Sequence, residues 1–372
     1  MIGFFNLTYH HDIGDKMRVG LCGWSLSGKS TVFDALTGVT GGEHQAGSGK
    51  ARVGVSHVPD ERLDFLATIF KPKKVTYATV EYVDLPGLVS DTHAHEANPK
   101  ILGDVRQADA LIAVVRAFAD PSVPASFGDI NPVRDYTRLL DELIFADLEV
   151  VVRRIERLEI DITKPTAHQK EDQMQLGALQ KIKAALEDGK PASSASLGEV
   201  EERTTHGFRF LSAKPLLVLV NRGEESVGES SKWTDKDFGA PCISMFAKLE
   251  LELAQLSADD RKAFMDDLGL KTLTAPEIIK KGYEILDQIS FLTAGDKEVR
   301  AWTITRGTPA VEAAGVIHSD IQRGFIRAEV TAYTDFQALG SFKEARAKGK
   351  LRLEGKEYVM QDGDIVEFRF SV

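Results

Sequence analysis

The first third of the chain alternates short apolar runs with amphipathic stretches. Arg18–Cys22, Val80–Asp84 and Ala110–Val115 are apolar runs with the length and composition of buried parallel strands. The stretch from Thr31 to Leu36, which follows the first of them, has the spacing of a helix. Strands and helices in alternation predict an α/β fold with a doubly wound parallel sheet.

The pattern changes near Tyr136, where apolar residues begin to recur at helical spacing over several turns, as far as Leu158. Residues 163–165 end this helix at a proline, and a second helix is expected from about Ala167 to Glu187. Two charged helices joined by a short break predict an antiparallel hairpin. An ordinary helical insertion and an arm that binds a partner are equally open as its purpose.

Strand-like segments return after the hairpin, at Pro215–Asn221 and Ala240–Ser244. The hairpin is therefore expected to be an insertion within the first domain. Two further helices are expected, at Leu256–Leu268 and Ala275–Leu286.

The segment after Gly295 has the order strand, helix, strand, helix and hairpin. So compact a mixture predicts a β-grasp module. Its expected elements are Val299–Thr305, Pro309–Ile321, Phe325–Tyr333, Phe336–Ala347 and a last strand at Asp364–Phe370. The predicted domains are an N-terminal extension at 1–16, an α/β domain at 17–135 and 205–287, the inserted helices at 136–204 and the C-terminal module at 288–372. Met17 is an alternative start of translation.

The residues from Gly23 to Thr31 fit G-x-x-x-x-G-K-[ST], the pattern of a phosphate-binding loop (P-loop). The two glycines, Gly23 and Gly28, let backbone N–H groups turn toward phosphate oxygens, helped by the helix N-terminus. Lys29 is expected to reach the β- and γ-phosphates, and the Ser30 hydroxyl to ligate Mg²⁺. The predicted phosphate-binding residues are Gly23, Ser25, Leu26, Ser27, Gly28, Lys29, Ser30 and Thr31.

A second motif, D-x-x-G, ends the strand at Val80–Asp84. Asp84 is expected to hold Mg²⁺ through water and the Gly87 N–H to contact the γ-phosphate, in a loop that moves when this phosphate leaves. A turn cap is the alternative role for Asp84 alone. The next residue is Leu88, where small GTPases have a glutamine that orients the attacking water. Leucine cannot orient water, so water must be positioned by another group; the predicted catalytic positions are Lys29, Gly87 and Leu88.

The strand at Pro215–Asn221 ends in N-x-x-E, where GTPases usually have Asn-Lys-x-Asp. In those proteins the aspartate accepts two hydrogen bonds from guanine. Glu224 is one methylene longer, and Arg222 stands where a lysine packs on the base. Asn221, Arg222 and Glu224 are therefore the predicted base-binding residues, with adenine favoured over guanine.

The chain has 372 residues, 43% of them hydrophobic, and a formal net charge of −10. Such an acidic chain is not a general polyanion binder, so DNA is not an expected partner, although basic runs at 71–74 and 343–352 leave RNA open. No apolar stretch has the length of a transmembrane helix, and no signal peptide is evident. Two isolated cysteines, Cys22 and Cys242, are expected to be buried structural residues and fit a reducing cytosol. We therefore expect a cytoplasmic protein without a membrane partner.

From Met17 to Val372 the chain resembles the YchF subfamily of Obg-like P-loop proteins, a lineage of GTPase fold that prefers ATP. The resemblance implies a helical hairpin inserted in the nucleotide-binding domain and a C-terminal TGS domain of β-grasp fold. It also implies hydrolysis of ATP or GTP, with association with ribosomes or ribosomal RNA. The segments that carry it are GKSTVFDALTG (28–38), VPDERLDFLATIFKPKK (58–74), EYVDLPGLV (81–89), VNRGEE (220–225), DDRKAFMDDLGL (259–270), 290–330 and DGDIVEFRF (362–370).

The chain departs from the family at four places. Leu26, in Ser-Leu-Ser instead of Pro-Asn-Val, lacks the atom with which an asparagine binds K⁺ in related GTPases. Ser48 lies in a glycine-rich stretch in place of the Mg²⁺-binding threonine of the first switch. His93 and His95 lie in an altered loop, where they position water, bind a metal or are simply solvated. Ala113 replaces a histidine implicated in hydrolysis. The predicted metal ligands are Ser30, Asp84 and Ser48.

These observations leave three functional hypotheses. The first is an ATP-preferring, monomeric nucleoside triphosphatase of low rate that uses Mg²⁺ and acts as a switch on the translation machinery. The second is a nucleotide-gated protein with negligible turnover that binds RNA or the ribosome. The third is a true GTPase despite Glu224.

Overall fold

The computed structural model describes residues 17–38, 51–90, 94–163 and 168–371. Contacts divide the chain into two compact units: Arg18–Gly54 with Tyr82–Ala275, and Val55–Glu81 with Pro276–Val372. The second unit thus takes in a segment near the N-terminus that we had expected in the nucleotide-binding domain. The four-part division expected above stays a prediction.

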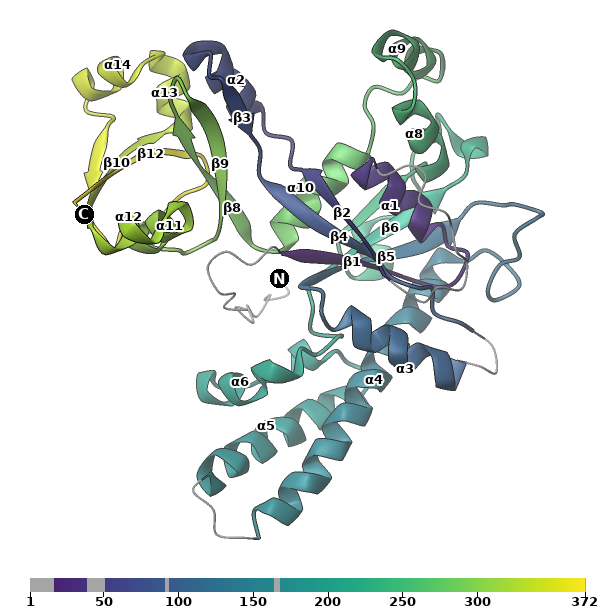
Figure 1. Ribbon diagram of the computed structural model, residues 1–372. Helices are drawn as coiled ribbons and strands as arrows, with labels where there is room; N and C mark the ends of the chain where they lie inside the picture. Colours follow the sequence, from purple (N-terminus) through teal and green to yellow (C-terminus); the bar gives the residue numbers. More distant parts are fainter. Residues whose placement is uncertain (1–16, 39–50, 91–93, 164–167, 372) are drawn as a thin grey trace. The chain divides into compact units, whose positions relative to one another are not determined.

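A six-stranded sheet forms the centre of the first unit, and its strand order is β2-β4-β1-β5-β6-β7. Neighbouring strands from β1 to β7 along this order pair in parallel register, as in Leu21 with Ile112 and Ala113 with Val218. Every residue of β5 but the last is buried, so this strand lies at the middle of the core. The fold expected from the sequence is confirmed (Figure 1). The strands are β1 Arg18–Cys22, β2 Arg52–His57, β4 Thr79–Asp84, β5 Ala110–Ala117, β6 Leu216–Arg222 and β7 Cys242–Met245.

Helices of the first unit follow the strands, as α/β alternation requires. The sequence analysis missed α8, which follows β7 directly and supports the phosphate-binding loop, while the helix expected at Leu256–Leu268 is confirmed as α9. The helices are α1 Lys29–Thr37, α3 Ala94–Val105, α7 Asp235–Phe238, α8 Ala247–Ala254 and α9 Ala258–Asp267.

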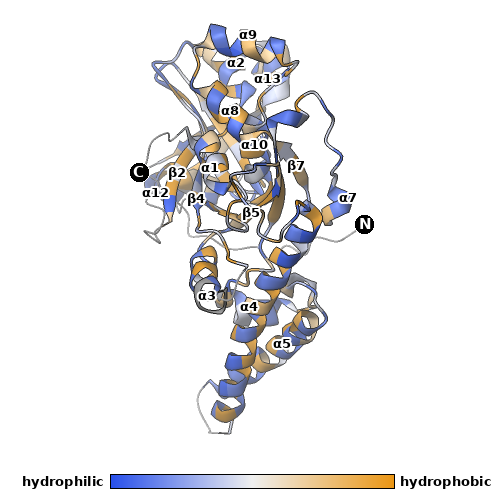
Figure 2. Cartoon of the chain, turned by 90° about the vertical axis from the view of Figure 1, so that its right-hand side faces the viewer, coloured by the Kyte–Doolittle hydropathy of each residue, from blue (hydrophilic) through white to orange (hydrophobic). Residues whose placement is uncertain are grey.

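The expected helical hairpin is present as α4 (Pro132–Asp161) and α5 (Gln169–Glu187), followed by α6 (Glu199–Thr205). Apolar residues of α4 and α5 form a core cluster together with Ala192 and Phe210, and Figure 2 shows such residues along both helices. Asp147 of α4 is fully buried and pairs with Arg106 at 2.8 Å. This ion pair ties the base of the hairpin to the segment after α3.

The second unit holds a sheet with the order β11-β10-β12-β8-β9-β3. Its core lies between the sheet and α11, and Phe291, Ala328 and Val330 are fully buried there. The β-grasp character expected from the sequence is confirmed, although β8 and β3 were not foreseen. The strands are β3 Lys74–Thr76, β8 Gln288–Ala294, β9 Glu298–Thr305, β10 Phe325–Ala332, β11 Arg352–Glu354 and β12 Asp364–Phe370.

Two helices that we had expected to be continuous are each broken in two. His318 is extended, with φ −167°, and its Nδ1 accepts a hydrogen bond from the Asp320 N–H at 3.1 Å, which starts a new helix. Gly340 is left-handed at φ 75°, and the Ser341 hydroxyl then caps the next helix. Local caps therefore override the apolar periodicity. The helices of this unit are α2 Glu61–Phe70, α10 Ala275–Ile285, α11 Ala310–Ile317, α12 Ser319–Arg323, α13 Tyr333–Leu339 and α14 Phe342–Ala347.

Candidate nucleotide-binding site

The phosphate-binding loop connects β1 to α1 and has the backbone conformation that its glycines allow. Gly23 and Gly28 have φ of 146° and 90°, values that side chains rarely tolerate. A Cβ atom on Gly28 would lie 2.1 Å from Nδ2 of Asn221, and one on Gly23 would lie 2.5 Å from the carbonyl oxygen of Val114. The loop is thus packed directly against β5 and β6, with no room for larger residues.

Lys29, the first residue of α1, is buried within this loop. Its Nζ donates a hydrogen bond to the carbonyl oxygen of Trp24 at 3.1 Å. Burial lowers the pKa of Lys29 from 10.5 to about 8, against the opposing charge of Asp84. Burial removes water from the ammonium group, which disfavours its charged form. A bound phosphate would supply a negative charge that compensates for this loss.

The D-x-x-G segment after β4 pairs with the loop through backbone hydrogen bonds. The Leu88 N–H donates to the carbonyl oxygen of Gly23 at 3.0 Å, and the Ser25 N–H donates to that of Leu88 at 2.8 Å. A Cβ atom on Gly87 would lie 2.8 Å from Nζ of Lys29, so this glycine lies against the lysine as the motif predicts. The Leu88 side chain is 2% exposed and packs in the core, which leaves it no contact with a water to orient.

Asp84, at the end of β4, is buried and bound to Arg52 of β2. Oδ2 of Asp84 accepts from Nη2 and Nε of Arg52 at 2.8 and 3.1 Å, and Nη1 of Arg52 donates to Oδ1 of Asp34 at 3.0 Å. The other oxygen of Asp84, Oδ1, is buried without a hydrogen-bond partner among the described residues. The sequence analysis missed Arg52, because no motif includes it and only the fold brings it to Asp84.

Asn221, at the end of β6, is buried and braces the phosphate-binding loop. Its Nδ2 donates to the carbonyl oxygen of Ser27 at 3.1 Å, and its Oδ1 accepts from the Ala247 N–H at 3.4 Å. Both ends of the amide are thus used within the protein. Its contact with a base stays a prediction, while its support of the loop is a role that sequence reasoning missed.

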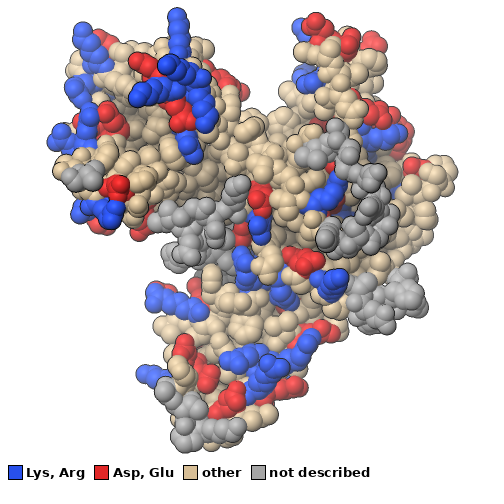
Figure 3. All heavy atoms as spheres, viewed as in Figure 1, with Lys and Arg blue, Asp and Glu red and all other residues tan. Residues whose placement is uncertain are grey.

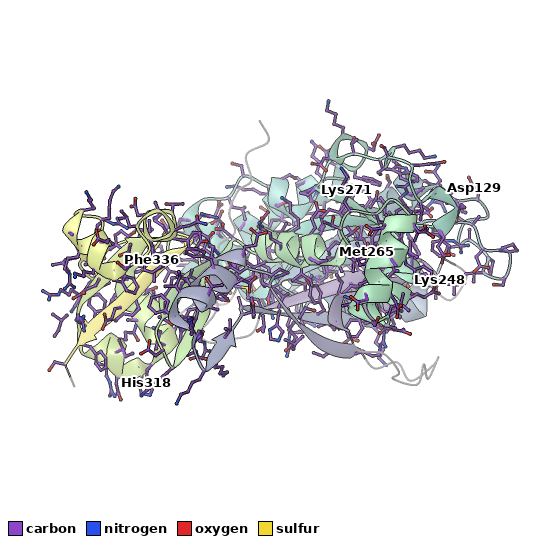
Figure 4. The ribbon with its side chains drawn as sticks, turned by 90° about the horizontal axis from the view of Figure 1, so that it is seen from above. Asp129, Lys248, Met265, Lys271, His318 and Phe336 are labelled. Carbon is purple, nitrogen blue, oxygen red and sulfur yellow. The ribbon has the colours of Figure 1, made fainter. Side chains whose placement is uncertain are left out.

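The other two predicted base-binding residues differ in exposure. Arg222 is buried, donates to the carbonyl oxygens of Ser226 and Glu229 at 3.1 and 3.0 Å, and lies over the ring of Phe246. Glu224 is exposed and pairs at 3.6 Å with Lys248, which lies on α8 (Figure 4). Of the three residues, only Glu224 has its side chain on the surface of the unit, where a ligand can approach it.

Trp24 and Ser126 are further neighbours of the loop that sequence reasoning missed. The Trp24 indole N–H donates to the carbonyl oxygen of Asp135, in the first turn of α4, at 2.8 Å. The Ser126 hydroxyl donates to the carbonyl oxygen of Ser25 at 3.0 Å. A tryptophan within a P-loop was the one available sign that this loop is anchored to the helical hairpin.

The structure does not describe every residue that the sequence predicted for the site. Ser48 and His93 lie outside the described residues, as does the side chain of His95. Among the residues that the structure describes, no three His, Cys, Asp or Glu side chains form a group that could hold a metal ion. Cys22 is buried, as expected, whereas Cys242 is only half-buried. Burial raises the pKa of both thiols to about 12, so neither is a reactive thiolate at neutral pH.

Comparison with known proteins finds similar sequences for both parts of the chain. A family model described as a 50S ribosome-binding GTPase matches residues 18–151. A model for the C-terminal part of YchF GTPases, described as a protein of unknown function, matches residues 288–371. The "Ribosome-binding ATPase YchF" of Bacillus subtilis is 37% identical in an alignment 375 residues long, which covers 96% of this chain and 100% of that protein. The chain belongs to the YchF family.

Other YchF proteins show the same correspondence along the whole length. The Pasteurella multocida protein is 37% identical over 364 residues, covering 95% of this chain and 99% of its own. The solved structure of the Schizosaccharomyces pombe YchF GTPase superposes with a TM-score of 0.83 at 32% identity, covering 96% of this chain and 98% of that one. The family membership and the fold class predicted from the sequence are therefore confirmed. Each described helix is too short or too polar to cross a membrane.

Proposed function

We propose that this YchF-family protein binds ATP and hydrolyses it slowly, uses GTP less well, and associates with the ribosome. The observation that carries the proposal is the preformed phosphate-binding loop, with Lys29 buried inside it and Gly87 packed against it. The names of the relatives, which include ribosome-binding ATPases, support the choice of ATP and of the ribosome.

The chain's own residues supply positioning and charge for phosphoryl transfer. Lys29 offers a positive charge to the β- and γ-phosphates, and the N–H groups at the start of α1 face the same space. The pairing of Leu88 with the loop supports a proposed contact of the Gly87 N–H with the γ-phosphate. Since Leu88 is buried and Ala113 is fully enclosed in β5, neither orients water, which is consistent with a low rate.

Mg²⁺ is the cofactor that these residues fit. The buried Oδ1 of Asp84 is without a partner among the described residues, and a carboxylate oxygen is the kind of group that accepts from a magnesium-bound water. Ser30 follows Lys29 in the first turn of α1, which supports its hydroxyl as a proposed ligand of the ion. When bound, Mg²⁺ neutralises charge on the β- and γ-phosphates. Ser48 stays a predicted third contributor.

A TGS-like C-terminal module and the α4–α5 hairpin are the proposed surfaces for the ribosome. Figure 3 shows Lys and Arg side chains on the C-terminal module interleaved with acidic ones. Three members of the basic run at 343–352 are engaged in ion pairs, Arg346 with Glu329, Lys350 with Asp335, and Arg352 with Glu354. We therefore propose a specific contact rather than a general affinity for polyanions, in a cytoplasmic, monomeric protein.

The second candidate is a nucleotide-gated RNA- or ribosome-binding protein with negligible turnover. The burial of Leu88 favours it, because the residue that would orient water is replaced and its substitute is enclosed in the core. This candidate shares the nucleotide site with the first and differs only in the rate of hydrolysis.

Calorimetric titration with ATP and with GTP in Mg²⁺ tests the binding, and steady-state release of phosphate tests the turnover. We expect tighter binding of ATP and phosphate release above that of a Lys29→Ala variant. Tighter binding of GTP would reject the base preference. Binding with turnover equal to that of Lys29→Ala would select the second candidate, and no binding of either nucleotide would reject both.

A further inference from the structure

Arg52 belongs to no sequence motif, yet it contacts several groups of the candidate magnesium site. Its guanidinium donates to Asp84 through two nitrogens and to Asp34 through the third, and it lies 4.7 Å from the centre of the Phe33 ring. Nη2 also reaches the carbonyl oxygen of Ser30 at 3.5 Å. One cation therefore touches the D-x-x-G carboxylate, a carboxylate of α1 and the residue expected to ligate magnesium.

Arg52 lies beside Asp34 and Asp84 because both carboxylates are buried. The side chains of Asp34 and Asp84 are 11% and 7% exposed, and that of Arg52 is 28% exposed. Carboxylates removed from water need a compensating cation. Arg52 is that cation in the structure, at the carboxylate where a magnesium ion would otherwise supply the charge.

We propose that Arg52 is a built-in competitor of Mg²⁺, which holds Asp84 and Asp34 until nucleotide-bound magnesium displaces it. This inference rests on the proposed function, since it concerns the same site. Arg52 binds Oδ2 of Asp84 and leaves Oδ1 without a partner among the described residues, so a hydrated ion can approach Oδ1 before Arg52 leaves Oδ2. The ion and the guanidinium then repel each other across the carboxylate, so binding of Mg²⁺ weakens the bond to Arg52.

The consequence is a threshold in free Mg²⁺ for tight binding of nucleotide. Arg52→Gln removes the competing charge and keeps a polar side chain of similar length. Arg52→Lys keeps a charge but lacks the planar fork with which the guanidinium binds Asp84 through two nitrogens. Arg209→Gln is a matched control: Arg209 pairs with Asp109 at 3.0 Å, and their side chains are 32% and 6% exposed, but neither belongs to the phosphate-binding loop or the D-x-x-G segment.

The main experiment measures ATP affinity against free Mg²⁺ for the full-length protein and these variants. We expect Arg52→Gln to lower the Mg²⁺ concentration at half-maximal affinity by about tenfold. Arg52→Lys is expected to lower it by about threefold, and Arg209→Gln to leave it unchanged. An unchanged midpoint in Arg52→Gln overturns the proposal; if that variant does not fold, an unchanged midpoint in Arg52→Lys does so.

A second experiment separates this proposal from the proposed function, because it uses Mg²⁺ without nucleotide. Thermal unfolding is followed with EDTA and with millimolar Mg²⁺. Mg²⁺ is expected to raise the melting temperature of Arg52→Gln by a few degrees more than that of the unchanged protein or of Arg209→Gln. If no nucleotide binds, this difference still supports the role of Arg52, and equal Mg²⁺ shifts in all variants overturn it.

Discussion

The phosphate side and the base side of the candidate site are built in different ways. On the phosphate side, Lys29 is buried and Gly87 packs against it, with Leu88 tied to the loop by two backbone hydrogen bonds. On the base side, Glu224 is exposed and has one ion pair, at 3.6 Å, with Lys248. The predicted phosphate contacts therefore belong to the folded core, whereas the predicted base contact of Glu224 comes from a surface side chain.

This contrast predicts that substitutions on the two sides of the candidate site have unequal effects. Exposed ion pairs contribute little, since water and salt screen them. Residues packed in the loop cannot change without moving the backbone. Substitutions on the phosphate side are therefore expected to affect both folding and binding, and those on the base side only the ratio of ATP to GTP.

Gly87→Ala should have the largest effect. Its Cβ atom would lie 2.7 Å from Cα of Ser25 and 2.8 Å from Nζ of Lys29, so the D-x-x-G segment must move off the loop. We expect ATP binding to weaken by at least about a hundredfold and stability to fall by about 1–3 kcal/mol. Calorimetry and urea unfolding measure these changes.

The matched control for this substitution is Gly177→Ala in α5, where an added Cβ would meet no atom within 4 Å. It should leave ATP binding unchanged and stabilise the protein by about 0.5–1 kcal/mol, because alanine is the better helix former. Unchanged ATP affinity in Gly87→Ala would mean that the close packing of this glycine is not needed for phosphate binding.

Asn221→Ala should have the next largest effect. It removes the donor to the buried carbonyl oxygen of Ser27 and the acceptor for the Ala247 N–H. An unsatisfied buried group costs about 1–3 kcal/mol, so unfolding in urea should occur at a lower midpoint. ATP and GTP affinity should fall together, by about tenfold. A loss confined to one nucleotide would show that Asn221 contacts the base and contradict its role as a brace.

The pH dependence of ATP binding tests whether the burial of Lys29 matters. The pKa of Lys29 is about 8 in the free protein, so raising the pH through 8 removes the charge that pairs with phosphate. Affinity should therefore fall by about tenfold between pH 7.5 and 9, and the loss should reverse on acidification. Lys29→Arg, which stays charged, should bind with no such slope. A flat profile in the unchanged protein would contradict the lowered pKa.

Glu224→Ala should have the smallest effect. Its side chain is exposed and pairs only with Lys248 among the described residues, so stability should stay within about 0.5 kcal/mol. The ratio of ATP to GTP affinity should change by a few fold, which competition between the two nucleotides measures. A change of a hundredfold or more would show that the base side is as tightly built as the phosphate side.

Much of the fold followed from apolar periodicity. The strands at Arg18–Cys22 and Val80–Asp84 and the two hairpin helices were predicted, because short apolar runs next to turn signals favour strands and long segments of helical periodicity favour helices. The helices expected at Pro309–Ile321 and Phe336–Ala347 were each broken, because the side chains of His318 and Ser341 accept hydrogen bonds from backbone N–H groups that begin a second helix. The strand β8 was missed, since it follows a helix without a turn signal.

The chain by itself determined the chemistry of the phosphate-binding loop, because Gly23, Gly28 and Lys29 act through backbone freedom and charge that are local to their positions. Tertiary structure alone decided three further points: that Leu88 is enclosed, that Asn221 braces the loop, and that Arg52 meets Asp84. These contacts join residues far apart in the chain, and no local pattern records which side chains a sheet brings together. Burial then changes what those side chains can do, since it lowers the pKa of Lys29 and makes an unpaired carboxylate costly.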